Sequence, residues 1–541
     1  MRKIPIGIED FKRIIVENYY YIDKTKFIEE IVDDGALVKL FTRPRRFGKT
    51  LNMSMLKYFF DIREKEENRK LFDGLYIENS SVIAEQGKYL VIFITMKDIK
   101  GNSLESLMDK FKTTISNLFV EYRYLREKLD ERDIDVFDAI WKKQDTDYSD
   151  SLKFLSRILK EYYNENAIIL IDEYDIPLIS AYEHGYYDKA IELFKILYSS
   201  VLKTNPNLKM GVMTGAIRIA QAGIFSDLNN IETHTILDEE YDEYFGLSEL
   251  EVEEALKEYG IEYDLEKVKL WYDGYRFGNM EIYNPWSILK YIKSNKLGAY
   301  WINTSGNMLI REVLKNSDKS VFDTLEGLFQ KKDTMVYINE SVAFDKNLLS
   351  NQIWELMLFS GYLTVKEELD NRTYLVRIPN KEIMTFFKEL FIDIVFDGNM
   401  TVINEMKIAL QIKDIEKIKQ CIEKLVLSAM SFYDTDKRYE NSYQTLLSGF
   451  FYALDGIYKL DSNKESGHGR PDLILEPLGK NKTAYILELK KAKTKNLKKE
   501  AAEALKQIEE NGYDTDLKRK GITDIVKMGI VFDVKKVEFS C

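Results

Sequence analysis

The chain has 541 residues and a formal net charge of −12, and 45% of its residues are hydrophobic. This length exceeds that of one domain, so we expect about three or four, each with its own hydrophobic core. The acidic balance argues against nucleic-acid binding by the whole surface, although a local basic patch would permit it. The first residues form no apolar signal-peptide core and no stretch approaches a membrane span, so we expect no membrane partner.

Cysteine and histidine are scarce in the chain. The two cysteines, Cys421 and Cys541, imply no disulfide framework and favour a reduced, cytoplasmic setting. The three histidines (His184, His234 and His468) are scattered and leave little for a zinc site. We therefore expect any metal to be bound by oxygen atoms, which suits Mg²⁺ or Mn²⁺.

A short apolar run near the N-terminus is followed by a basic loop and then by a helical pattern. Residues 36–41 have the length of a buried strand, and the loop after them ends in Gly48-Lys49-Thr50. This order is the context of a phosphate-binding loop, in which backbone N–H groups at the helix start face the phosphates. We expect Gly48, Lys49 and Thr50 to bind ATP, with Lys49 at the β- and γ-phosphates and Thr50 at Mg²⁺.

The loop departs from the usual phosphate-loop pattern at its beginning. Arg43 stands where a glycine is usual, and Pro44 follows it, so the loop is stiffer and more basic. The alternative interpretation is a basic surface turn before a core helix.

A second apolar run, residues 166–171, ends in two acids, Asp172 and Glu173. Strands buried on both faces of a parallel sheet read as continuous apolar runs, and ligands bind at their carboxyl ends. We expect Asp172 to hold Mg²⁺ through water and Glu173 to act as general base on the attacking water. The alternative is a strand capped by acids before a turn at Pro177.

A third strand, residues 209–215, carries a polar residue near its end. Thr214 is placed to sense the γ-phosphate, and Arg218 follows four residues later. Arg218 is a candidate phosphate ligand, with a surface arginine as the alternative. Residues 90–94 form a further expected core strand.

Five segments of the first half resemble a prokaryotic AAA-ATPase-like family. They are YIDKT at 21–25, RPRRFGKT at 43–50, TGAIRI at 214–219, IFSDLNN at 224–230 and WYDGYRFG at 271–278. In that family the arginine-proline loop replaces the glycine-rich one. The resemblance implies an AAA-type P-loop ATPase domain that is commonly followed by a C-terminal PD-(D/E)XK nuclease domain.

The middle of the chain carries no catalytic motif. Residues 247–252 have a polar entry followed by apolar positions at helical spacing, which predicts the start of a helical lid. Residues 374–379 are predicted to form a strand and residues 381–396 a helix. Residues 273–278, with two glycines, predict a tight loop. Arg276 within it is a candidate phosphate contact, although pairing with an acid is the favoured interpretation.

Two short apolar strands near the C-terminus carry two carboxylates and a lysine. Asp472 begins the first strand, and Glu488, Leu489 and Lys490 end the second. Side chains alternate along a strand, so Glu488 and Lys490 share a face, and a hairpin would let Asp472 face Glu488. Both carboxylates and the Leu489 carbonyl would then hold one Mg²⁺, while Lys490 positions water or stabilises charge on phosphorus.

This pattern resembles the PD-(D/E)XK nuclease family. The resemblance implies that an upstream acid, here Glu440, completes the metal site. A glutamine-tyrosine pair recurs in exonuclease-like members, but Gln507 and Tyr513 are six positions apart rather than four. The alternative is an edge hairpin with solvated charges. Six lysines between 490 and 499 would hold a phosphate backbone, or form a solvated helix face.

The expected fold class is a multidomain α/β protein with three parts. Residues 1–245 would form a P-loop, AAA-like parallel-sheet core, residues 246–400 a helical lid and connector, and residues 401–541 a restriction-endonuclease-like α/β domain. The leading hypothesis is an ATP-binding, Mg²⁺-dependent nuclease, with Mn²⁺ possible at the nuclease site, that acts on DNA rather than RNA and can form a homo-oligomer. The alternative is a nucleotide-controlled binding or signalling switch whose nuclease fold is not catalytic.

Overall fold

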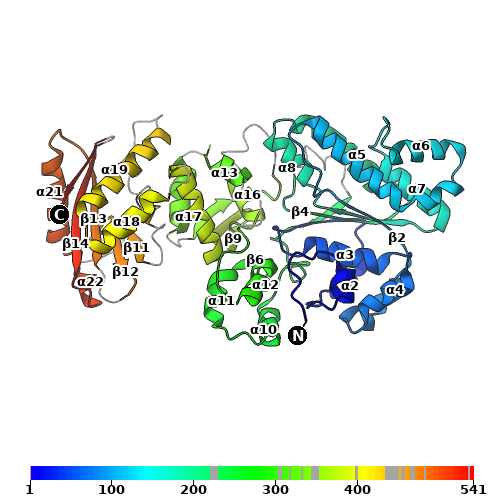
Figure 1. Cartoon of the computed structure of the whole chain (residues 1–541), viewed down its shortest axis with the longest axis horizontal. Coiled ribbons are helices and arrows are strands. Elements are labelled where there is room, and N and C mark those ends of the chain that lie inside the picture. The colour runs from blue at the N-terminus through cyan, green and yellow to red at the C-terminus, as the bar shows by residue number, and fades with distance from the viewer. Residues whose placement is uncertain are drawn as a thin grey trace. The chain divides into compact units, whose positions relative to one another are not determined.

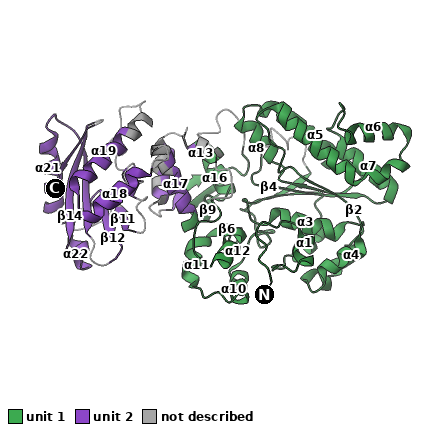
Figure 2. Ribbon diagram, viewed as in Figure 1, with its two compact units in different colours: residues 1–313, 335–382 green, residues 314–334, 383–541 purple. Residues whose placement is uncertain are grey.

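The computed structural model describes most of the chain. The described residues are 2–219, 230–302, 308–315, 319–329, 333–342, 352–396, 400–432, 447, 450–451, 457–462, 470–479, 483–533 and 536–541. They divide into two compact units, one of residues 1–313 and 335–382 and the other of residues 314–334 and 383–541 (Figure 2). Among the described residues, every helix is too short or too polar to cross a membrane.

The first unit is built around a parallel sheet of five strands in the order β2-β3-β4-β1-β5. The strands are β1 (Val38–Thr42), β2 (Leu90–Thr95), β3 (Ala167–Asp172), β4 (Leu208–Gly215) and β5 (Ile231–His234). Every residue of β1 and β3 is buried, as their apolar runs predicted. The parallel-sheet core expected from the sequence is therefore confirmed.

Helices cover both faces of this sheet (Figure 1). The helices of this part of the chain are α1 (Phe11–Val16), α2 (Lys26–Asp33), α3 (Lys49–Phe60), α4 (Lys65–Arg69), α5 (Leu104–Glu121), α6 (Glu131–Trp141), α7 (Ser151–Tyr163), α8 (Ile176–Glu183) and α9 (Tyr187–Leu202), with short 3₁₀ turns at Lys70–Phe72, Tyr76–Asn79, Ser81–Glu85 and Arg123–Lys128. The α2, α3 and α4 helices lie on one face, and α5, α7 and α8 lie on the other (Figure 1).

A smaller helical region follows the sheet within the first unit. It contains α10 (Glu249–Glu258), α11 (Leu265–Tyr272), β6 (Tyr275–Phe277), β7 (Met280–Ile282) and α12 (Pro285–Ser294). Ser248 and Glu251 form a capping box that starts α10, which confirms the predicted helix. The prediction of a tight loop at 273–278 is wrong. Residues 275–277 form the strand β6, which pairs antiparallel with β7 as a hairpin. Tyr275 and Phe277 are buried on one face of this strand, and Arg276 lies on the other.

The remaining elements of the middle region are short helices and a three-stranded sheet in the order β8-β10-β9. They are α13 (Met308–Lys315), α14 (Lys319–Phe329), β8 (Thr334–Tyr337), α16 (Ile353–Phe359), β9 (Thr364–Asp370), β10 (Thr373–Arg377) and α17 (Lys381–Phe396). The strand and helix predicted at 374–379 and 381–396 are confirmed by β10 and α17. Residues of α17 from Ile383 onward belong to the second unit.

The second unit contains a mixed sheet in the order β11-β12-β13-β14-β15, in which only the β13–β14 pair is parallel among the described strands. The strands are β11 (Tyr458–Ser462), β12 (Leu473–Pro477), β13 (Ala484–Lys491), β14 (Ile525–Asp533) and β15 (Lys536–Ser540), and the helices beside them are α18 (Thr401–Ile412), α19 (Ile415–Phe432), α21 (Leu497–Glu510) and α22 (Thr515–Arg519). Alternate residues of β12 and β13 pack against α18 and α19 or against α21 and α22. The sheet is thus covered on both faces.

The helix α21 lies unusually close to the strand β14. A Cβ atom added at Gly529 would lie 2.3 Å from the carbonyl oxygen of Ala501 and 2.5 Å from the nitrogen of Leu505. Glycine is the residue that permits this approach. The contact fixes α21 against the part of the sheet that carries the paired carboxylates.

Candidate functional site

The loop between β1 and α3 has the geometry that its sequence predicts. Gly48 has a φ of 86°, in the left-handed region, and immediately precedes Lys49, the first residue of α3. Glycine adopts this conformation without a steric cost, which lets the chain turn sharply into the helix. The first N–H groups of α3 are therefore directed toward the loop, as an anion site at a helix start requires.

The side chain of Lys49 is folded into its own loop. Its Nζ donates to the carbonyl oxygens of Arg43 at 2.8 Å and Pro44 at 2.9 Å. Burial lowers the pKa of Lys49 below its ordinary value, although nearby acids, Glu173 first among them, oppose this. Phosphate oxygens would offer this ammonium group charged acceptors in place of the two carbonyls.

Asp172, at the carboxyl end of β3, accepts hydrogen bonds from hydroxyl groups of neighbouring elements. Its Oδ2 accepts from Thr50 Oγ1 at 2.9 Å, and its Oδ1 accepts from Thr214 Oγ1 at 2.6 Å. Because β4 lies between β3 and β1, Thr214 reaches Asp172 from the intervening strand. Burial raises the pKa of Asp172. A cation beside the carboxylate would lower this pKa again and favour the ionised form. This set of oxygen atoms fits Mg²⁺.

Glu173 leaves the strand in an unusual backbone conformation. Its φ is 54°, in the left-handed region, and its N–H donates to Thr214 Oγ1 at 3.3 Å. A non-glycine residue held there is strained, and such strain clusters at functional sites. The general-base role of Glu173 stays a prediction.

Asp175 is a buried acid of this site that the sequence analysis missed. Its Oδ2 accepts from the backbone N–H groups of Ala216 at 2.8 Å and Ile217 at 3.1 Å, which fixes the segment after β4. Its Oδ1 is buried without a hydrogen-bond partner in the described part of the chain. The spacing of three acids in four residues, 172–175, was the available signal.

Arg43 does not make the surface of the loop between β1 and α3 more basic, contrary to the expectation from sequence. The side chain is fully buried, and its guanidinium donates to the carbonyl oxygens of Thr42, His234 and Tyr241 at 3.0, 2.8 and 3.3 Å. Burial lowers the pKa of Arg43 to about 10. Arg43, which replaces the usual glycine, therefore stabilises the loop through hydrogen bonds on its buried side.

Arg218 lies near the end of β4 but is engaged elsewhere. Its Nη1 contacts Glu340 Oε2 at 3.1 Å. The structure thus pairs Arg218 with an acid, and its role as a phosphate ligand stays a prediction.

A buried glutamate and a tryptophan connect the loop between β1 and α3 to α17. The indole N–H of Trp301 donates to the carbonyl oxygen of Arg45 at 2.9 Å. Glu382, the second residue of α17, accepts from the backbone N–H groups of Tyr300 and Trp301 and from Ser287 Oγ. Burial raises the pKa of Glu382 to about 7.

The strands β12 and β13 bring the predicted nuclease carboxylates together. They are antiparallel, with Leu473 opposite Leu487, so the next position of this register places Asp472 opposite Glu488. Asp472 Oδ2 accepts from the backbone N–H of Leu489 at 2.7 Å. The hairpin predicted from strand alternation is therefore present, while the catalytic roles of its residues stay predictions.

Glu488 is almost completely buried and only partly satisfied. It is 6% exposed, its Oε1 accepts from Gln507 Nε2 on α21, and its Oε2 has no hydrogen-bond partner among the described residues. Burial, followed by the charge of Asp472, raises the pKa of Glu488 to about 8. A divalent cation beside Glu488 and Asp472 would satisfy the free oxygen and favour ionisation, so this pair fits a metal.

The other predicted residues of this site have different outcomes. Lys490 is half-buried and shares the Glu488 face of β13. Gln507 contacts the glutamate, whereas Tyr513 packs in the core beside α21. Glu440 lies outside the described residues, and the Leu489 carbonyl stays a predicted metal ligand.

The two sites define a chain with an ATPase-like part and a nuclease-like part. Residues 5–225 match the model of a predicted AAA-ATPase family, and residues 438–540 match that of the PD-(D/E)XK nuclease superfamily. An uncharacterized protein from the vnfD 5′ region of Azotobacter chroococcum mcd 1 is 23% identical over 537 residues, which cover 96% of this chain and 94% of that protein. The two family resemblances seen in the sequence are confirmed.

Proposed function

We propose that this chain is an ATP-binding, metal-dependent nuclease that hydrolyses phosphodiester bonds, in DNA rather than RNA. The proposal rests on one observation above all. The opposed carboxylates of Asp472 and Glu488 lie in a buried hairpin, and one buried oxygen of Glu488 has no hydrogen-bond partner among the described residues. Burial opposes the ionisation of both acids, and the charge of Asp472 further opposes that of Glu488, so the pair is poorly suited to a purely structural role and well suited to holding a cation.

The residues of the hairpin would divide the work of hydrolysis. Asp472, Glu488 and the Leu489 carbonyl would hold Mg²⁺ or Mn²⁺, and Gln507 would keep the Glu488 carboxylate in place. A divalent ion there supplies charge neutralisation at phosphate and a lower pKa for water. Lys490 would orient the attacking water or stabilise the charge that builds on phosphorus.

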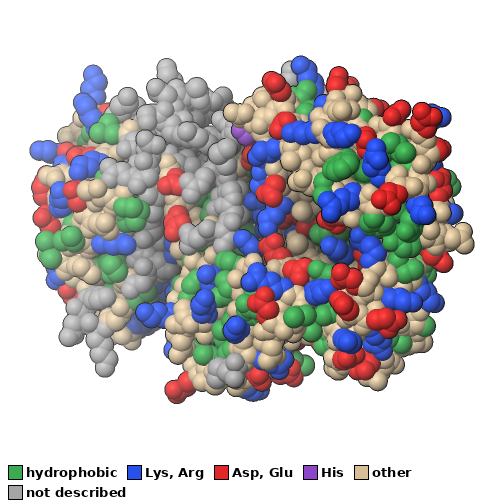
Figure 3. Space-filling model, turned by 45° about the vertical axis from the view of Figure 1, so that its right-hand side comes forward, with side chains coloured by type: hydrophobic (Ala, Val, Ile, Leu, Met, Phe, Trp, Pro, Cys, Tyr) green, Lys and Arg blue, Asp and Glu red, His purple; other side chains and the backbone are tan. Residues whose placement is uncertain are grey.

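Exposed lysines from the end of β13 to the first turn of α21 support a nucleic-acid substrate. Lys491, Lys493, Lys495, Lys498 and Lys499 are all exposed there. On the face shown in Figure 3, basic and acidic side chains are interspersed. With a net charge of −12, contact with a phosphate backbone would therefore depend on a local patch such as this one.

The phosphate loop would make the nuclease responsive to nucleotide. Lys49 and the helix start would bind the phosphates of ATP, Thr50 and Asp172 would hold Mg²⁺, and Glu173 would activate water for hydrolysis. Nucleotide state would then position or gate the nuclease part.

Cleavage of single- and double-stranded DNA and of RNA tests the proposal. With Mg²⁺ or Mn²⁺, and with and without ATP, the wild-type chain should cut DNA. Asp472→Asn removes a charged ligand of the proposed metal ion and Lys490→Ala removes a group that stabilises charge in the transition state, so each should reduce cleavage at least about a hundredfold. ATP binding should survive in both variants.

Two neighbouring substitutions serve as matched controls. Lys506→Ala removes an exposed lysine of α21 that lies outside the lysine group at 490–499, and Glu476→Gln removes an acid of β12 that pairs with Lys520. Both variants should retain wild-type cleavage. If the wild-type chain cuts no nucleic acid under any of these conditions, the non-catalytic switch becomes the better account of the chain.

A further inference from the structure

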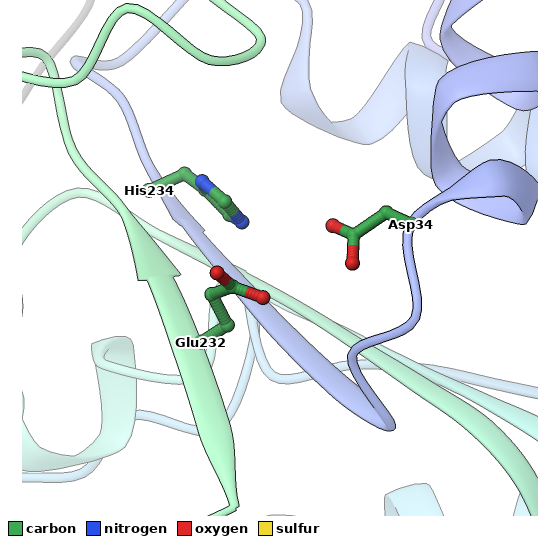
Figure 4. Close-up of side chains that lie close together, drawn as sticks. All are labelled: Asp34, Glu232 and His234. Carbon is green, nitrogen blue, oxygen red and sulfur yellow. The ribbon is translucent and has the colours of Figure 1, made fainter.

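Three metal-ligating side chains that are far apart in the sequence meet beside the edge strand β5 (Figure 4). Asp34 follows α2, whereas Glu232 and His234 lie two positions apart on β5 and so share a face. One carboxylate oxygen from each acid and one ring nitrogen of His234 all lie within 4.8 Å of one another. None of these residues belongs to the phosphate loop or to the carboxylate hairpin.

His234 presents an unused nitrogen to this cluster. The ring is 2% exposed, and its Nε2 is buried without a hydrogen-bond partner among the described residues. Its Nδ1 lies 3.4 Å from Glu240 Oε2. A carboxylate beside Nδ1 favours the proton at that nitrogen and leaves a lone pair on Nε2. Figure 4 shows the ring directed into the space between the two carboxylates.

The charges around the cluster favour a cation. Asp34 accepts from Tyr241 and from the N–H of Ala36, and its Oδ1 lies 3.6 Å from Lys39 Nζ. Lys39 also donates to the carbonyl oxygens of Asp34 and Ala36, so its ammonium keeps acceptors if Asp34 is shared. The carboxylate of Asp238 favours a positive charge at His234, whereas the guanidinium of Arg43 opposes one. The acids therefore outnumber the bases around His234, counting Asp34, Glu232, Asp238 and Glu240 against Lys39 and Arg43.

We propose that Asp34, Glu232 and His234 bind a divalent transition-metal ion, with Zn²⁺ as the best fit. Imidazole nitrogen combined with carboxylate oxygen is a donor set that zinc prefers and magnesium does not. Bonds of about 2.1 Å in a tetrahedral site bring ligand atoms to roughly 3.4 Å from one another. Glu232 is exposed, so its side chain has room to turn inward and close the gap. Water would complete the coordination.

Such an ion would fasten the edge of the sheet behind the phosphate loop. It would tie the segment after α2 to β5, which is an edge strand paired with β1. The carbonyl oxygen of His234 accepts from Arg43, and the carbonyl oxygen of Arg43 accepts from Lys49. The role is structural, and it is independent of the metal that the proposed nuclease reaction needs.

Zinc binding by the full-length chain tests this site. The protein is freed of metal with a chelator and dialysed against Zn²⁺ in millimolar Mg²⁺, which competes at the oxygen-only sites. Bound zinc is then measured by mass spectrometry and by titration calorimetry. The wild-type chain should retain one equivalent, and His234→Gln and Glu232→Gln should each weaken binding at least about tenfold, as should Glu240→Gln, which supports the histidine from outside.

Matched substitutions separate this site from other zinc ligands. His184→Gln changes an exposed histidine, and Asp33→Asn changes the exposed acid beside Asp34. Both should bind zinc as the wild-type chain does. Glu232→Gln replaces an exposed side chain and keeps the test valid if His234→Gln does not fold. Failure of the wild-type chain to retain zinc, or equal binding by Glu232→Gln, would overturn the proposal.

Discussion

At the scale of single residues, the ATPase-like site depends on a buried network of hydroxyl and carboxylate groups. Thr214 donates to Asp172 and accepts from the N–H of Glu173, so one hydroxyl fixes both acids. The Thr214 side chain is also buried, and a polar group left without a hydrogen-bond partner costs the most free energy in the protein interior. The threonine that the sequence suggested as a γ-phosphate sensor thus also orients the two acids.

Thr214→Val should therefore impair ATP hydrolysis more than ATP binding. Valine matches the shape of threonine but leaves Asp172 Oδ1 and the Glu173 N–H without their partner, so we expect hydrolysis to fall at least about tenfold. Nucleotide affinity, measured by calorimetry, should change less. Thr214→Ser keeps the hydroxyl and should retain most of the activity. Equal hydrolysis by the valine and serine variants would contradict this role.

At the scale of elements, the contact between α21 and β14 controls the geometry of the nuclease-like site. Gln507 reaches Glu488 from α21, and the glycine at 529 sets how close this helix lies to the sheet. Gly529→Ala should destabilise the second unit by about 2 kcal/mol, because overpacking forces the helix outward. Chemical denaturation should show this loss, and DNA cleavage should fall with it.

Gly298→Ala is the matched control for that substitution. A Cβ atom at Gly298 would lie 3.7 Å from the Tyr300 ring, which is ordinary contact. Its stability should remain within about 0.5 kcal/mol of the wild-type value, as for most substitutions away from tight packing. A similar loss in both variants would show that the close approach at Gly529 has no special effect.

The sequence predicted those elements whose signal is local. The strands β1, β3, β12 and β13 were recognisable because apolar runs or strict alternation define them, and Lys49 and Glu488 lie in short motifs. Some contacts were not predictable because they depend on how distant segments pack. They are the contact of Gln507 with Glu488, the backbone hydrogen bonds of Asp175 and the proximity of Asp34 to His234. Arg43 was misjudged for the same reason, since only the folded chain shows the carbonyl groups that surround it.

At the scale of the whole molecule, α17 belongs to both compact units. Its residues Lys381 and Glu382 are part of the first unit, and the residues from Ile383 are part of the second. The Glu382 carboxylate accepts hydrogen bonds from Ser287, Tyr300 and Trp301. The protonation of one carboxylate therefore affects how the start of this shared helix is held.

Stability should depend on pH through Glu382. Its pKa is about 7 in the folded chain against an ordinary value of 4.5, so between these pH values the folded state binds more protons than the unfolded state. The free energy of unfolding should thus fall as pH rises from 4.5 to 7, by up to about 3 kcal/mol. In Glu382→Gln this part of the pH dependence should disappear, which denaturation at several pH values would measure. An unchanged slope in the variant would contradict the assignment.

The hydrogen bond from Trp301 to the loop between β1 and α3 has an optical consequence. The chain has 5 tryptophans, and Trp301 is only 1% exposed. An indole held in a dry environment, with its N–H on the Arg45 carbonyl, emits light whose wavelength depends on that environment. A ligand that displaced this carbonyl would break the hydrogen bond and change the surroundings of the ring. Trp301 is thus an intrinsic fluorophore beside the loop between β1 and α3, and a change in its emission when ATP is added would report the nucleotide binding that we propose for this loop.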